Sequence, residues 1–137
     1  MKAVEINQTG APEVINLKDI SLEKPNSDEV TIEQKAIGLN YIDTYHRSGL
    51  YPLKLPSGLG LEGAGIIIEV GSNVTNFKAG DKVAYAAIPL GSYSTHRNFP
   101  AAKLVKIPDG VDFDVAATLM TKGLTTYYLL HQTYKVK

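Results

Sequence analysis

The sequence predicts a mainly β domain, a barrel or sandwich of short strands with a few short helices. Three observations lead to this fold class. Segments of alternating apolar and polar residues recur along the chain, turns containing Gly, Pro or Asn separate them, and a run of three isoleucines occupies residues 66–68. The chain has 137 residues, 44% of them apolar, which is enough to bury the core of one compact domain.

Two segments illustrate how the strands are assigned. In 28–37, Val30 and Ile32 share one face, which is the period-two pattern of a half-buried strand. The β-branched run within 65–71 is typical of a strand buried on both faces. By these criteria, strands are expected at 2–7, 12–21, 28–37, 65–71, 81–88, 92–99 and 103–107.

Two regions are expected to be helical. Residues 41–48 suit two helical turns that Gly49 would end. Asp112 can cap a helical segment over 114–120, and a further segment begins at Gly123. In that last segment apolar and aromatic side chains recur at helical spacing, and we expect them to pack in the core rather than bind a ligand. They are Leu124, Tyr127, Tyr128, His131 and Tyr134.

Composition excludes several classes of function. Fourteen basic residues balance fourteen acidic ones without a charged block, so no nucleic-acid partner is expected. No apolar run is long enough to cross a membrane and no signal peptide is apparent, so we expect a cytoplasmic protein without a membrane partner. The chain has no cysteine and only three histidines, which excludes thiolate chemistry and gives little support to a metal site.

The stretch PSGLGLEGAG contains the pattern G-x-G-x-x-G at Gly58, Gly60 and Gly63. In a dinucleotide-binding turn, this pattern follows a strand and opens a helix whose N–H groups meet the pyrophosphate. Here the preceding residues include Pro52 and Pro56 and are not expected to form a strand, while the isoleucines that follow favour a strand over a helix. We therefore interpret the glycines as the entry to a buried strand.

The same stretch resembles a different family. GLGLEGAGIIIEVGSNVTNFKAGDKV is similar to the segment G-H-E-x-x-G…V-G…G-D-x-V of medium-chain dehydrogenases/reductases. KAIGLNYIDTYHRSGLYP, FDVAATLMTKGLTTYYLL and the opening MKAVEINQTGAPEVI resemble the zinc-free, zeta-crystallin-like quinone oxidoreductases, in the same order along the chain. The resemblance implies a GroES-like, partly open β-barrel, which is the N-terminal catalytic domain of that family.

The resemblance implies a site without a metal. Where zinc-dependent alcohol dehydrogenases place a ligating Cys and His, this chain has Asn40 and Leu61, and the cysteine-rich structural zinc lobe is absent. Glu62 remains, but one carboxylate cannot hold zinc. We expect Glu62 to have a structural role, accepting hydrogen bonds from the backbone or from Arg47.

The resemblance also implies a second domain. In that family a Rossmann-type nucleotide-binding domain begins just beyond the position of Lys137, and its glycine turn is absent from this chain. We divide the chain into a GroES-like catalytic domain at 1–121 and a helix at 122–137 that leads toward that domain. NADPH would be bound mostly by the absent domain, so this chain alone is expected to be nearly inactive, and the full-length parent is expected to be a homodimer.

Hydride transfer to a quinone requires that the negative charge developing on the acceptor oxygen be stabilised. The donors implied by the resemblance are Asn40, whose amide has two donor hydrogens, and Tyr51, whose phenol can stack on a quinone ring and donate a hydrogen bond. For both residues a structural role is an equal alternative: Asn40 as a turn residue and Tyr51 as a packed surface tyrosine.

Contacts to the nicotinamide half of NADPH are expected from the start of the helix at 41–48 and from the last helix. Alternatives remain open: Asp43 is also suited to cap the first helix or to pair with Arg47, and Lys122 to be a solvated charge. The expected cofactor contacts are Tyr41, Ile42, Asp43, Thr44, Tyr45, Thr126 and Tyr128.

The sequence leaves three candidate functions. The first is the catalytic domain of an NADPH-dependent quinone oxidoreductase that reduces its acceptor without a metal. The second is an enone or 2-alkenal reductase, because the same donors suit conjugate hydride addition. The third is a non-enzymatic GroES-like module for binding or structure. Substrate panels separate the first two, and the presence of a nucleotide-binding domain separates both from the third.

Overall fold

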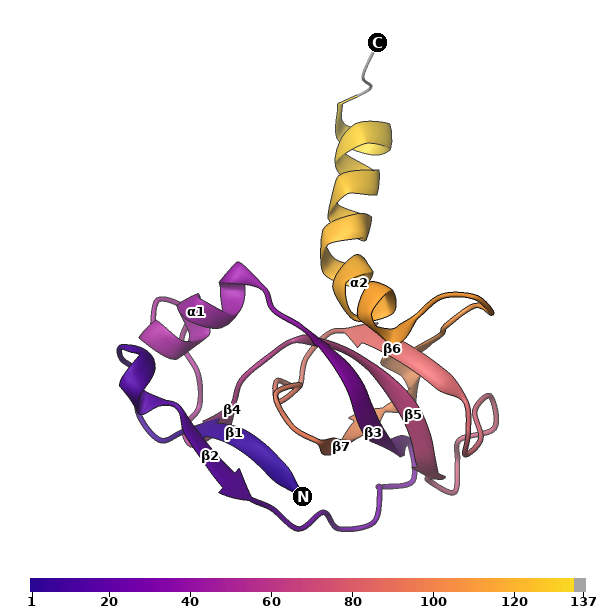
Figure 1. The fold of residues 1–137 in the computed structure, drawn as a ribbon, viewed down its shortest axis with the longest axis horizontal. Coiled ribbons are helices and arrows are strands. Elements are labelled where there is room, and N and C mark those ends of the chain that lie inside the picture. The colour runs from indigo at the N-terminus through magenta and orange to yellow at the C-terminus, as the bar shows by residue number, and fades with distance from the viewer. Residues whose placement is uncertain (135–137) are drawn as a thin grey trace.

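The computed structural model describes residues 1–134, which form two antiparallel sheets and a helix that projects from them (Figure 1). One sheet has the strand order β2-β1-β4 and the other β7-β3-β5-β6-β8. The strands are β1 Lys2–Ile6, β2 Asn16–Asp19, β3 Glu29–Gly38, β4 Ser57–Gly58, β5 Glu62–Val70, β6 Lys82–Ala86, β7 His96–Pro100 and β8 Val105–Lys106. The helices are α1 Tyr41–Ser48 and α2 Phe113–Tyr128, with 3₁₀ turns η1 Pro12–Val14 and η2 Ala101–Lys103 and a π turn η3 Leu129–Thr133.

The predicted mainly β fold class is confirmed, and within residues 1–134 the two sheets do not close into a complete barrel. The core lies in the larger sheet, where β3 pairs with β5 on one side and β7 on the other. Val30 and Ile32 are both fully buried, as their alternation predicted. Val30 lies opposite Val70 and Phe99 in the two neighbouring strands. These cross-strand pairs stabilise the sheet that carries the site.

The prediction that segment 65–71 is buried on both faces is wrong. Ile67 is fully buried, but Ile68 next to it is 44% exposed. Strand β5 belongs to an antiparallel sheet, in which one face packs on the core and the other can meet solvent. The run of three isoleucines therefore indicates that this segment forms a strand, but it does not indicate that both faces of the strand are buried.

Five other predicted strands are shorter in the structure: 2–7 ends at Ile6, 81–88 is reduced to Lys82–Ala86, and three more change at their starts. The segment 12–21 begins with the 3₁₀ turn η1 because Pro12 favours the first position of a helical turn, and the strand starts only at Asn16. The segment 92–99 becomes extended at His96, and 103–107 is reduced to Val105–Lys106 after η2. The helix at Tyr41–Ser48 is as predicted, and Gly49 ends it with φ of 87°.

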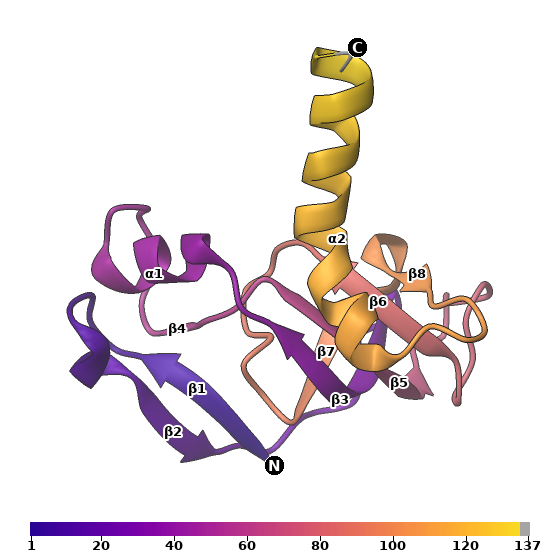
Figure 2. The same cartoon turned by 45° about the horizontal axis from the view of Figure 1, so that its top comes forward.

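Helix α2 corrects two further predictions. It runs through Gly123 instead of starting there, and the side chain of Leu119 packs where a Cβ of Gly123 would lie. The C-terminal part of α2 extends away from both sheets (Figures 1 and 2). Leu124 is 59% and Tyr127 58% exposed, so the predicted core packing of this aromatic stripe is wrong for this chain.

The glycines of the G-x-G-x-x-G pattern pack against the chain itself. A Cβ on Gly60 would lie 2.1 Å from Ser92 Oγ, and one on Gly63 would lie 2.8 Å from the hydroxyl of Tyr85. Gly60 also has φ of 91°, a conformation that favours glycine. The interpretation of these residues as an entry to β5, with a strand and no helix following, is confirmed. The expectation that no strand precedes the glycines is wrong at its end, because Ser57 and Gly58 form β4 and pair with β1.

We expect Gly60→Ala to destabilise the protein more than Gly80→Ala. Gly80 has nearly the same φ, 92°, but nothing lies within 4 Å of its added Cβ. The left-handed backbone should cost about 1 kcal/mol in each variant, and the clash in the core should add about 2 kcal/mol for Gly60→Ala alone. Urea unfolding measures the difference, and equal losses would show that the close packing around Gly60 is not a constraint.

Candidate functional site

The buried carboxylate of Glu62 joins three segments of the chain. Glu62 begins β5 and is fully inaccessible to solvent. Its Oε1 accepts a hydrogen bond of 2.8 Å from the backbone N–H of Thr121 in α2. Its Oε2 accepts one of 2.7 Å from Nδ2 of Asn40, which follows β3. The expected structural role of Glu62 is therefore confirmed, with backbone and amide donors in place of Arg47.

Lys122 completes a network with Asn40 and Glu62. Its Nζ donates to Asn40 Oδ1 at 3.0 Å and to the carbonyl of Leu39 at 3.1 Å. The same Nζ lies 3.9 Å from Glu62 Oε2, while the Lys122 side chain remains 54% exposed. Of the two alternatives left open for Lys122, the side chain is solvent-exposed as a solvated charge would be, but its ammonium is also hydrogen-bonded to the segment after β3.

The approach of α2 to the end of β3 requires a glycine. A Cβ at Gly38 would lie 2.1 Å from the carbonyl oxygen of Ala117 and 2.8 Å from Glu62 Oε2. Because Gly38 has no side chain, α2 lies close enough for Thr121 to bond to Glu62 in β5 and for Lys122 to bond to Asn40, just after β3. The network consequently depends on contacts between residues up to 83 positions apart in the chain.

Asp43 orders the first turn of α1. Its Oδ2 accepts the backbone N–H of Asn40 at 3.0 Å and the hydroxyl of Tyr93 at 2.7 Å, and the residue is 4% exposed. Of the roles considered for Asp43, these bonds are those of a residue that caps α1. Among residues 1–134, neither bond involves Arg47. Burial and the bond to Asp43 raise the pKa of Tyr93, so its phenol remains a donor at neutral pH.

An aromatic cluster lies beside Asn40 along α1 and the loop after it. The ring centroid of Tyr45 is 5.4 Å from that of Tyr41 and 5.3 Å from that of Tyr51. Tyr41 is 77% and Tyr51 45% exposed. The backbone N–H of Tyr51 donates to the Tyr45 carbonyl at 3.2 Å, which fixes the loop on the helix. Exposed aromatic side chains thus follow Asn40 along α1 and the loop after it, and such side chains can pack on a planar ligand.

The remaining predicted residues divide between the two helices. Ile42 is half-buried, and the Thr44 hydroxyl donates to the Tyr41 carbonyl at 2.7 Å. Thr126 lies one turn after Lys122 and donates to the Lys122 carbonyl at 2.9 Å, while Tyr128 is 45% exposed further along α2. The sequence did not single out Lys122 as a partner of Asn40. The one indication in the sequence was that Lys122 lies four residues before Thr126, on the helix that we expected to contact the cofactor.

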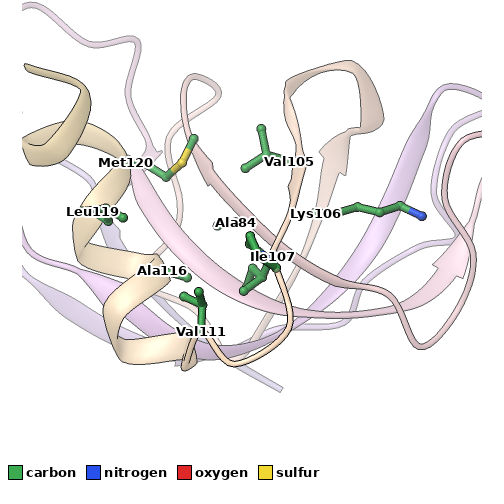
Figure 3. A pocket seen from close by; sticks show the side chains of 9 residues that line it. Ala84, Val105, Lys106, Ile107, Val111, Ala116, Leu119 and Met120 are labelled. Atoms are coloured by element: carbon green, nitrogen blue, oxygen red, sulfur yellow. The ribbon is translucent and has the colours of Figure 1, made fainter. Parts of the chain in front are cut away.

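A separate apolar hollow lies between α2 and strands β6 and β8 (Figure 3). Its volume is about 140 Å³, and α2 contributes Ala116, Leu119 and Met120 to its wall. Lys106 extends away from the apolar side chains (Figure 3), and its Nζ lies 3.0 Å from an Asp81 oxygen. The hollow therefore offers packing surface rather than a reactive group.

The network does not fit a zinc ion. Glu62 uses both oxygens for hydrogen bonds, Asn40 offers an amide, and the third member is a cation that would repel a metal. Among residues 1–134, no three His, Cys, Asp or Glu side chains are grouped so that they could hold a metal ion. Over the same residues, no helix is both long and apolar enough for a membrane span.

Residues 26–109 match the alcohol dehydrogenase GroES-like domain. The chain belongs to this family. The chain is 54% identical over 137 residues to a quinone oxidoreductase of Pseudomonas aeruginosa and 42% identical over 141 residues to a 2-haloacrylate reductase of a Burkholderia species. It superposes on the structure of Escherichia coli quinone oxidoreductase complexed with NADPH with a TM-score of 0.96 and 48% identity.

These similarities extend over nearly the whole chain but only part of each relative. The matches include 99% of this chain for the Pseudomonas protein and 98% for the Burkholderia protein, yet 42% of each of those relatives. The superposition likewise includes 100% of this chain and 42% of the E. coli chain. The chain thus spans about two fifths of the length of the relatives it matches.

We expect Glu62→Gln to destabilise the GroES-like domain by about 2 kcal/mol, because an amide has one acceptor oxygen where the carboxylate accepts two charge-assisted bonds. Glu69→Gln, on the exposed part of the same strand, is the matched control and should change stability by less than about 0.5 kcal/mol. Chemical unfolding of both variants measures this. Similar values for the two would mean that the Glu62 bonds contribute little to stability.

Proposed function

We propose that this chain is the catalytic domain of an NADPH-dependent quinone oxidoreductase that stabilises its reduced acceptor without a metal. The observation that supports this most directly is the hydrogen-bonded network of Asn40, Glu62 and Lys122, followed along the chain by the exposed aromatic side chains of α1 and the loop after it. Such a surface combines donors for an acceptor oxygen with an apolar face for a quinone ring. The similarity to quinone oxidoreductases over nearly the whole chain supports the same assignment.

Asn40 is the proposed donor to the acceptor oxygen. Its Nδ2 gives one hydrogen to Glu62 and has a second hydrogen available, and its orientation is fixed by Lys122 at Oδ1. A donor whose position is set before the substrate arrives needs no reorganisation as charge develops. Tyr51, half-exposed and packed against Tyr45 with its ring tilted by 55°, is proposed to hold the acceptor ring and to donate from its phenol.

NADPH, when bound, would supply the hydride, and the residues of this chain fit only one side of it. Gly58, Gly60 and Gly63 approach protein atoms and leave no phosphate turn. The start of α1 and the exposed face of α2 are proposed to contact the nicotinamide half, and most of the dinucleotide would be bound by a Rossmann-type domain beyond 122–137. The contacts proposed here are Tyr41, Ile42, Thr44, Tyr45, Thr126 and Tyr128. Asp43 was also expected to contact the cofactor, but it is 4% exposed and bonded to Asn40 and Tyr93, so it is assigned the capping role instead.

Reduction of an activated alkene is the second candidate function. The relative named 2-haloacrylate reductase is 42% identical to this chain, and a solved 2-haloacrylate reductase superposes on it with a TM-score of 0.87. Conjugate hydride addition also places negative charge on a carbonyl oxygen, so the same donors would serve. The proposal further includes a homodimeric full-length enzyme in the cytoplasm, as the family resemblance implies.

The full-length enzyme, treated with a chelator, should oxidise NADPH in the presence of simple quinones. A matched panel of 2-haloacrylates and 2-alkenals, followed by NADPH absorbance, separates the two candidate functions by their kcat/KM ratios. Added zinc should not raise the rate, because the network offers no zinc ligand set. Failure with every quinone would contradict the first proposal, and failure with both panels would contradict both.

Residues 1–137 alone should bind NADPH with a Kd above about 1 mM. The glycines that could have bound phosphate are packed, so only weak contacts to the nicotinamide half remain. Fluorescence titration of the isolated chain against the full-length enzyme tests this. Micromolar binding by residues 1–137 would contradict the division of the cofactor between two domains.

A further inference from the structure

The ammonium group of Lys122 has an unused hydrogen. Two of its three hydrogens are directed to the Leu39 carbonyl and to Asn40 Oδ1. Glu62 Oε2, at 3.9 Å, is too distant for the third hydrogen bond. One N–H of Lys122 is therefore available to a ligand.

The position of Lys122 differs from that of an ordinary surface lysine. Its side chain is 54% exposed, whereas Glu62 is fully buried and Asn40 is 6% exposed. The hydrogen bonds to Leu39 and Asn40 hold the ammonium in one place instead of leaving it free in solvent. The network thus presents its positive charge outward and its negative charge inward.

The surface around this ammonium suits an aromatic ring with an oxygen. Leu39 is 71% and Tyr41 77% exposed, and they flank Asn40 in the chain. Lys122 Nζ is bonded to the Leu39 carbonyl and to Asn40 Oδ1, so a ligand oxygen that reaches the Asn40 amide also lies near the ammonium. Such an oxygen would receive one neutral and one charged hydrogen bond, and the charged bond is the stronger of the two.

We propose that Lys122 donates a hydrogen bond to the acceptor oxygen and is the charged group that stabilises the oxyanion formed there. This inference rests on the proposed function and adds to it a residue and a preference for anionic oxygen. The hydride and its electron pair reduce the acceptor, the negative charge appears on the acceptor oxygen, and a proton from water neutralises it. Lys122 keeps its own proton throughout.

A purely structural role for Lys122 is the competing explanation. Its bonds to Leu39 and Asn40 also tie α2 to the end of β3. Lys122→Gln separates the two roles, because glutamine keeps amide donors near these oxygens but removes the charge. Lys122→Arg keeps the charge, and Lys24→Gln, on an exposed residue between β2 and β3, controls for the loss of one positive charge.

The first measurement is the spectrum of bound 4-nitrophenol in the full-length enzyme, since its phenolate absorbs in the visible and its phenol does not. Lys122→Gln should raise the pKa of the bound phenol by about one unit, a tenfold change in ionisation. Lys122→Arg and Lys24→Gln should leave this value near that of the unsubstituted enzyme. This readout does not depend on turnover or on NADPH.

The second measurement is quinone reduction. Lys122→Gln should lower kcat/KM by about 10²-fold, mainly through kcat, and Lys122→Arg should restore most of it. Melting temperatures of the variants show whether folding is retained.

Two results would overturn the proposal. One is an unchanged phenol pKa together with an unchanged kcat in Lys122→Gln, and the other is a folded Lys122→Arg variant that is as impaired as Lys122→Gln. If the unsubstituted enzyme reduces no quinone or alkene, the proposed function fails, while the phenol titration still decides whether Lys122 stabilises an oxyanion.

Discussion

The carboxylate of Glu62 is the contact on which the arrangement of the site depends. A fully buried carboxylate is unfavourable unless its oxygens are hydrogen-bonded, and here one oxygen accepts the Thr121 N–H and the other the Asn40 amide. Because these donors come from α2 and from the end of β3, neither segment can move without leaving a buried oxygen unpaired. The position of Asn40 is therefore determined by the fold of the whole domain rather than by its own loop.

Local signals in the sequence were sufficient for much of the fold. Alternation identified the core face of β3 through Val30 and Ile32, and Gly49 marked the end of α1. The order of elements around Gly60 was enough to reject a phosphate-binding turn. The resemblance of the segments quoted from the sequence agrees with the family match over residues 26–109.

Other features could not be predicted because they depend on contacts between distant residues. Lys122 and Asn40 are 82 positions apart, and no periodicity in either segment indicates that they meet. Helical spacing did identify an apolar stripe on α2, but spacing cannot show what packs against it, and Leu124 and Tyr127 are exposed in this chain. The roles of Asn40 and Tyr51 remain predictions, because hydrogen-bond geometry alone does not place a substrate.

The continuity of α2 has a mechanical consequence. With η3 it extends about 16 Å beyond Lys122, at about 1.5 Å per residue. If this rod pivots by about 5° around the Thr121–Glu62 anchor, its outer end moves by about 1.4 Å and Lys122, adjacent to the pivot, by much less. Lys122 and Asn40 thus lie close to the pivot. A displacement of the outer end of α2 therefore changes the hydrogen bond between them very little.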